Sequence, residues 1–303
     1  MNRWDFSIAM SSAGWILGSP RFLRDVAGDA APAGSPRRPA LRTGIGALDA
    51  LLGGFRPGEV VVLAGPAGVG KTALAAQASA HISAGLGVPV AYFSLEDSSD
   101  DLRLRMACQL AFVDHVRERV DPLSELEARR LSGAREMVRG APLAIDAWFP
   151  LDPGDFERQV RGRVEVDRAD LVVVDHHPGL VGRGPRGREF KARLCRLAQE
   201  LDVPILALTQ ARMPGGVFCG PPPTGDGSAR ELWLRRAGET DVGGVAGREA
   251  VLVDGGRVAG RARLEFDGRS GRFWSPGAGA AVREAHGKTA APAGPCRVPT
   301  GPA

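Results

Sequence analysis

A phosphate-binding loop that directly follows an apolar run is the feature that most limits how this chain can fold. The run is residues 59–64, and the loop reads Gly65-Pro66-Ala67-Gly68-Val69-Gly70-Lys71-Thr72. Glycines let the backbone approach phosphate oxygens, and N–H groups at the start of the following helix then point at the anion. The pattern predicts a strand, a nucleotide-binding P-loop and a helix over 71–83. Lys71 is expected on the phosphates of ATP, and the Thr72 hydroxyl on Mg²⁺.

The rest of the chain alternates between apolar runs and segments with helical spacing. Strands are expected at 88–95, 142–145, 171–175 and 204–209, and helices at 100–112, 122–138 and 188–201. The early runs are apolar throughout, which is typical of strands that helices cover on both faces. This order predicts an α/β fold with a mostly parallel central sheet flanked by helices. The runs 250–253 and 261–266, around a Gly-rich turn, predict a C-terminal β-hairpin.

Composition divides the chain into three parts. Residues 27–40 are rich in Pro, Ala and Gly, so we expect 1–40 to be an N-terminal segment that ends in a linker. Residues 41–275 carry the predicted ATPase domain, and 276–303 are expected to be a disordered tail. No apolar run approaches the ~20 residues that span a bilayer, and the N-terminus lacks the pattern of a signal peptide. We therefore expect a cytoplasmic protein with no membrane partner.

Charge and cysteine content limit the partners less strongly. The formal charge of +4 permits a polyanion partner without establishing one. The four cysteines include no CxxC pair, so we expect reduced thiols and no zinc site.

Three polar residues stand at the carboxyl ends of predicted strands, which is where parallel sheets bind their ligands. Asp175 is expected to hold Mg²⁺ beside the P-loop, with a turn-forming aspartate as the alternative. Glu96 is expected to activate the attacking water, with capping of the next helix as the alternative. Gln210 is either a contact for the γ-phosphate or an exposed polar residue, and its spacing alone does not decide between the two.

Several segments, taken in order with the P-loop, resemble the C-terminal ATPase domain of the DnaB family of replicative helicases. They are Leu41-Arg42-Thr43-Gly44, 48–59, Phe93-Ser94-Leu95-Glu96, Pro142-Leu143-Ala144-Ile145-Asp146 and 203–210. The resemblance covers 41–275 and implies a RecA-like P-loop core that hydrolyses ATP with Lys71, Glu96 and Gln210. It also implies a hexameric ring of identical subunits, single-stranded DNA in the central channel, and partners in DNA replication.

The resemblance indicates a DNA contact as well. Arg230 and Glu231 match an Arg-Glu pair in the family's DNA-contact loop, although that loop continues with a glycine and this chain with leucine and tryptophan. Three further arginines on the Gly-rich loop after Asp175 are either phosphate contacts or part of a solvated basic loop. They are Arg183, Arg186 and Arg188.

Two departures from the family pattern concern the ATP site. Asp175 is followed by His176 and His177, where the family has an aromatic residue and a glutamine-containing turn; we expect a loop role for this pair. The family's trans-acting lysine and arginine fall on Val253 and Gly255 in this chain. Neither can stabilise the charge of a transition state, so Arg257 is the expected arginine finger and Arg261 the poorer candidate.

Three functions remain open at this point. The first is an ATP-dependent helicase or translocase of DnaB type that moves on single-stranded DNA. The second is a RecA-fold regulatory or recombinase-like ATPase that does not unwind DNA. The third is a degenerate relative that binds nucleotide with little hydrolysis.

Overall fold

The computed structural model describes residues 39–120, 122–147, 152–176, 185–210, 229–242 and 245–278. The predicted N-terminal segment and tail therefore lie almost entirely outside the described residues. Across the described ranges, no helix is both long and apolar enough to cross a membrane.

A parallel sheet forms the centre of the fold, as the apolar runs predict. Its strands are β1 (Val60–Gly65), β2 (Val90–Ser94), β3 (Leu143–Ala147), β4 (Leu171–Asp175) and β5 (Ile205–Gln210). They lie in the order β3-β2-β4-β5-β1. The P-loop strand β1 is thus separated from β4, which ends in Asp175, by the single strand β5. All three carboxyl ends meet at one edge of the sheet.

Antiparallel strands extend this sheet beyond β1. Strand β6 (Arg230–Val242) runs parallel to β1 and then pairs antiparallel with β7 (Val245–Asp254), which is followed by β8 (Arg257–Asp267) and β9 (Arg272–Trp274). The predicted C-terminal hairpin is present as β7 and β8, but both strands are longer than expected. Strand β6 was not predicted, because charged residues interrupt its apolar positions.

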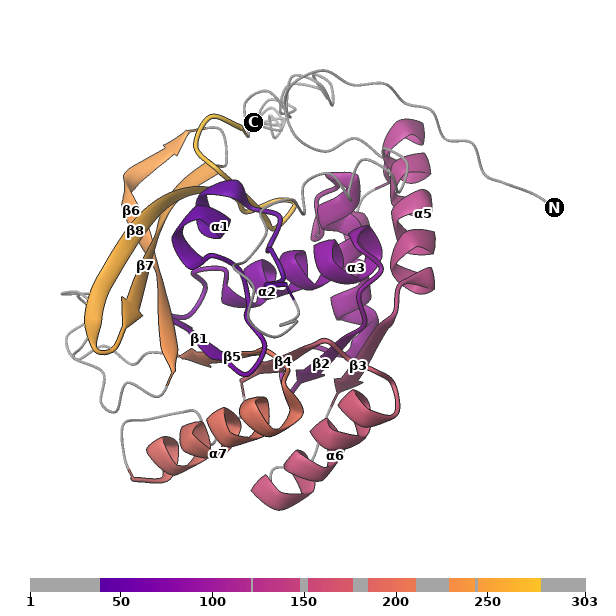
Figure 1. Cartoon of the computed structure of the whole chain (residues 1–303). Coiled ribbons are helices and arrows are strands. Elements are labelled where there is room, and N and C mark those ends of the chain that lie inside the picture. The colour runs from indigo at the N-terminus through magenta and orange to yellow at the C-terminus, as the bar shows by residue number, and fades with distance from the viewer. Residues whose placement is uncertain are drawn as a thin grey trace, which may run out of the picture.

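Helices cover the parallel sheet on both faces (Figure 1). One face carries α2 (Lys71–Ala80), α3 (Ser99–Ala111) and α5 (Glu125–Gly140), while α1 (Gly46–Leu52) packs against β7 and β8. The other carries α6 (Pro153–Glu165) and α7 (Pro185–Leu201). Alternate residues of β1 serve the two layers: Val61 and Leu63 join the first core, and Val60 and Val62 the second. The short helix α4 (Arg117–Val120) precedes α5, and α2 continues as a π-helical turn, η2 (His81–Gly85).

Local capping explains where two of the helices begin. Ser98 accepts a hydrogen bond from the backbone N–H of Asp101 and so starts α3. Ser124 and Glu127 form a reciprocal capping box, which starts α5 at Glu125 and not at the predicted position 122.

The first P-loop glycine has a packing role in addition to its place in the phosphate loop. Strand β6 passes so close to the end of β1 that a Cβ atom at Gly65 would lie 2.4 Å from the carbonyl oxygen of Leu234 and 3.1 Å from a methyl carbon of Val69. Both neighbours belong to the folded core, so neither can move at low cost. Glycine is therefore required at Gly65 by the sheet as well as by phosphate binding.

Replacement of Gly65 by alanine is expected to lower the free energy of unfolding by about 1–3 kcal/mol, the usual cost of overpacking. Gly133→Ala is the matched control, because Gly133 lies on α5 with nothing within 4 Å of an added Cβ. That change is expected to raise stability by about 0.5–1 kcal/mol. Urea unfolding monitored by circular dichroism measures both. Equal stability of Gly65→Ala and the wild type would show that β6 does not constrain this position.

Candidate ATP site

The P-loop holds its lysine over the loop backbone. Lys71 is the first residue of α2 and only 5% exposed, and its Nζ donates to the carbonyl oxygens of Gly65 at 3.2 Å and Pro66 at 3.0 Å. Gly68 and Gly70 have φ values of 67° and 105°, which favour glycine. Burial lowers the pKa of Lys71, and the negative charges of Asp175 and Glu96 partly offset this. The two carboxylates thus act electrostatically on the P-loop lysine.

Residues of the antiparallel strands β7, β8 and β9 pack against the P-loop. The backbone at Gly70 lies against Phe273, because an added Cβ would be 2.8 Å from that ring. Phe273 packs on Phe266 with ring centroids 4.5 Å apart, and the Arg248 guanidinium lies 4.9 Å from the centroid of Phe266. Arg248 Nε also donates to the carbonyl oxygen of Val69 at 3.1 Å. No sequence motif predicts this support, since Arg248, Phe266 and Phe273 lie far from the P-loop along the chain and belong to no local pattern.

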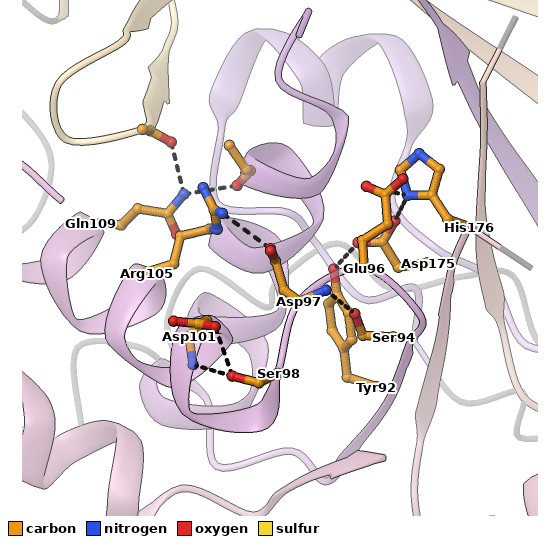
Figure 2. Close-up of polar contacts among 12 residues, drawn as sticks. Tyr92, Ser94, Glu96, Asp97, Ser98, Asp101, Arg105, Gln109, Asp175 and His176 are labelled. Carbon is orange, nitrogen blue, oxygen red and sulfur yellow. Dashed lines mark hydrogen bonds and ion pairs between the residues drawn. The ribbon is translucent and has the colours of Figure 1, made fainter. Parts of the chain in front are cut away.

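Asp175 ends β4 and is fully buried. Figure 2 shows its carboxylate between two side chains. The Tyr92 hydroxyl donates to Oδ2 at 2.8 Å, and the His176 Nδ1 lies 2.5 Å from Oδ1. Burial and the adjacent Asp175 raise the pKa of Tyr92 well above its ordinary value, so its hydroxyl stays protonated. Asp175 is therefore held in a defined orientation.

Glu96 lies in the turn after β2, at the same edge of the sheet. Its side chain is 55% exposed, and its Oε2 lies 3.2 Å from Nδ1 of His176. Burial lowers the pKa of His176, but Asp175 and Glu96 raise it more, so the net pKa lies above the ordinary value. The turn itself is fixed through Asp97, whose N–H donates to Ser94 and whose carboxylate pairs with Arg105 at 3.0 Å. The structure thus presents Glu96 to solvent beside a buried aspartate.

Gln210 is the last residue of β5 and pairs in register with Gly65. Its side chain is exposed at the carboxyl edge of the sheet. The strand order therefore brings Gln210 next to the first residue of the P-loop.

The donor set fits a nucleotide with Mg²⁺. The Thr72 hydroxyl and the Asp175 carboxylate are oxygen ligands of the kind that Mg²⁺ prefers, and this ion commonly binds through few protein groups plus substrate phosphates. Mg²⁺ held by Thr72 and Asp175 would take its remaining ligands from the phosphates and from water. No group of three or more His, Cys, Asp or Glu residues in the described ranges is arranged to hold a metal ion by itself.

Two of the predicted DNA contacts lie away from the P-loop edge of the sheet and form bonds within the chain. Arg230 and Glu231 start β6, paired with Val61 and Val62, at the end of β1 away from the P-loop. Arg230 donates to the carbonyl oxygen of Leu52 at 2.7 Å and to Glu59 at 3.4 Å. Glu231 is buried and accepts from the Trp233 indole at 3.2 Å. Their polar groups are engaged within the chain, which makes them poor candidates for a contact with DNA.

The remaining basic candidates differ in position. Arg183 and the side chain of Arg186 lie outside the described residues, whereas Arg188 is exposed on α7. Arg257 is exposed and follows the tight turn between β7 and β8. Arg261 lies further along β8, with its Nη1 3.5 Å from Glu249. Arg257 is thus the arginine nearest the tip of this hairpin.

Comparisons with known proteins match the chain to one family of helicase domains. The family model of the DnaB-like helicase C-terminal domain matches residues 40–213. The replicative DNA helicase DnaB of Treponema pallidum is 32% identical over 180 residues, covering 57% of this chain and 41% of that protein. DnaB of Synechocystis is 29% identical over 178 residues, covering 57% of this chain and 20% of that protein.

A solved structure of a DnaB-like replicative helicase has the same fold. It superposes with a TM-score of 0.63 at 19% identity and covers 78% of this chain and 62% of that one. The match to the two curated relatives spans less than half of the length of each. The family model matches more than half of this chain, and the chain therefore belongs to the family of DnaB-like helicase C-terminal domains.

Proposed function

We propose that this protein hydrolyses ATP and uses the reaction to move along single-stranded DNA, as a replicative helicase of DnaB type. The observation that carries the proposal is the meeting of the P-loop, Glu96 and Asp175 at one edge of the parallel sheet. The curated relatives are named replicative DNA helicases, and the assignment of that activity to this chain is our proposal.

The site residues divide the chemistry among them. The eight residues from Gly65 to Thr72 bind the phosphates, and Lys71 adds a positive charge there. Thr72 and Asp175 would hold Mg²⁺, which supplies neutralisation of phosphate charge when bound. Glu96 accepts a proton from the attacking water, and its exposed side chain gives water access. Gln210 contacts the γ-phosphate from the strand beside the P-loop.

A neighbouring subunit completes the site in this proposal. Arg257 lies beside Asp254, and Asp254 reaches to 3.6 Å from Arg230 at the opposite end of the sheet from the P-loop. The strand from Arg248 at the P-loop to Asp254 spans about 20 Å. Arg257 therefore lies far from its own P-loop, and the nucleotide that it contacts would belong to another subunit. This supports a homo-oligomer, for which we propose the hexameric ring.

A second candidate is a RecA-fold ATPase that regulates or assembles on a partner without unwinding DNA. The observation that favours it is the internal engagement of Arg230 and Glu231, which leaves the expected DNA contact without its two named residues. Arg188 on α7 remains an exposed basic candidate for a DNA contact.

One set of measurements on the full chain separates these functions. We expect ATP hydrolysis that rises on addition of a single-stranded oligonucleotide, displacement of a strand from a forked duplex, and a ring-sized particle with a non-hydrolysable ATP analogue. Lys71→Ala gives the background rate. Turnover indifferent to DNA, with no strand displacement, would support the regulatory ATPase instead. Nucleotide binding without ATP hydrolysis would support the third function, a degenerate relative that binds nucleotide only.

A further inference from the structure

Tyr92 is the only tyrosine in the chain. It lies on β2, paired with Val173 of the neighbouring β4, and it is completely buried in the core on the α2 side of the sheet. Its ring packs among apolar side chains, but its hydroxyl extends to the end of β4 and donates to Asp175 Oδ2 at 2.8 Å. The residue thus connects the hydrophobic core directly to the carboxylate at the ATP site.

The hydrogen bond from Tyr92 to Asp175 has a buried carboxylate as its acceptor. Hydrogen bonds to a charged acceptor are stronger than neutral ones, and a buried carboxylate loses a large part of its solvation. The phenol occupies one oxygen and leaves Oδ1 on the other side of the carboxylate, where Nδ1 of His176 lies. Glu96 follows at 3.2 Å from the same imidazole nitrogen. The four side chains therefore form one polar chain, Tyr92–Asp175–His176–Glu96, visible in Figure 2.

The structure assigns a positioning role to Tyr92: we propose that its hydroxyl fixes the orientation of the Asp175 carboxylate for a magnesium-bound nucleotide. This inference rests on the proposed function, because it requires that Asp175 faces the Mg²⁺ ion of a bound nucleotide. Mg²⁺ demands near-ideal octahedral geometry, so a carboxylate held in one rotamer binds it better than one free to turn. Side chains that hydrogen-bond to a metal ligand without touching the metal typically change the metal affinity by about 10–100-fold when they are removed.

A merely structural role is the competing explanation, because a buried tyrosine hydroxyl usually finds some partner. The two roles differ in what the removal of a single oxygen atom does. A structural tyrosine would change stability and leave the magnesium dependence of nucleotide binding unaltered. A positioning tyrosine would change the affinity for nucleotide only when magnesium is present.

Tyr92→Phe tests the proposal through binding of a fluorescent ATP analogue, with Mg²⁺ and with EDTA. We expect the Kd with Mg²⁺ to rise about 10- to 100-fold and the Kd in EDTA to stay unchanged. Val90→Ala is the matched control, because Val90 is a buried residue of the same strand with a purely apolar side chain. It should lower stability without changing the magnesium dependence. An equal effect of the two variants on the magnesium dependence would overturn the proposal.

Two further measurements require no hydrolysis. Because the chain has one tyrosine, ¹³C labelling of the tyrosine ζ carbon alone gives a single signal, which should shift on addition of Mg²⁺ with a non-hydrolysable analogue. In an Asp175→Asn background, Tyr92→Phe should have little additional effect on the Kd, since the two residues act as a unit. An unmoved signal, or fully additive effects, would contradict the proposal while nucleotide binding persists. Failure of the wild type to bind the magnesium nucleotide would instead remove the proposed function and this inference together.

Discussion

Glu96→Gln is expected to slow ATP hydrolysis by about 100- to 10,000-fold, the contribution of a positioned general base. Glutamine keeps the size of the side chain but cannot accept a proton from water at neutral pH. Glu96 is 55% exposed and lies outside the P-loop, so the affinity for nucleotide should change little. The kcat from a phosphate-release assay and the Kd for a fluorescent nucleotide measure the two effects separately.

Glu136→Gln provides the matched control for this substitution. Glu136 is exposed on α5, away from the carboxyl edge of the sheet, and the same chemical change there should leave kcat and Kd as in the wild type. If Glu96→Gln kept most of the wild-type rate, water activation would have to be assigned to another group. A lost affinity for nucleotide with unchanged kcat would instead make Glu96 part of the binding site.

Arg257→Ala is expected to lower kcat by about 10³- to 10⁵-fold, the range for an arginine that reaches a phosphoryl-transfer site. Arg257 stands at the β7–β8 turn, at the opposite end of the sheet from its own P-loop, so its effect should be exerted in trans. Mixing Arg257→Ala with Lys71→Ala tests this directly. Each variant lacks a different half of the shared site, and mixed assemblies should recover part of the activity that neither variant has alone.

Arg261→Ala serves as the control on the same strand. Its guanidinium lies 3.5 Å from Glu249 on β7, and the arginine side chain is 54% exposed, so its removal should weaken one partly exposed ion pair and affect kcat only slightly. No recovery in the mixed assemblies would place Arg257 outside the neighbouring site. A larger loss from Arg261→Ala than from Arg257→Ala would assign the trans-acting role to Arg261.

The central sheet was predictable because its strands are mostly apolar, with their polar residues at or near the carboxyl ends. The predicted run 171–175 coincides with β4, and the other central strands differ from their predictions by one or two residues at either end. Helix α6 was missed, since Pro153 and Gly154 suggest a loop; Pro153 in fact occupies the first turn, after Asp152 caps the helix. Strand β6 was missed because its buried Leu232 and Leu234 stand among charged residues.

Some features of the site follow from the order of the sequence, whereas others depend on contacts between residues that are far apart in the chain. The P-loop and the carboxyl ends of β2, β4 and β5 follow from sequence order, because parallel strands bring these ends to one edge. The bond between Tyr92 and Asp175 joins residues 83 positions apart, and no spacing rule anticipates it. The support of the P-loop by Arg248 and Phe273 is equally non-local. Arg230 and Glu231 show that a short sequence match does not fix the surroundings of a residue. The dipeptide matches a DNA-contact pair, but both side chains are bonded within the chain.

Through the contact of Arg248 with the P-loop, β7 connects two parts of the molecule that the proposed reaction uses. One end of this strand holds the carbonyl of Val69, and the other end leads into the turn that carries Arg257. Six residues, or about 20 Å of extended chain, separate Arg248 from Asp254 at that turn. Under the proposed function, one strand would therefore join the P-loop of one ATP site to the arginine that serves the next.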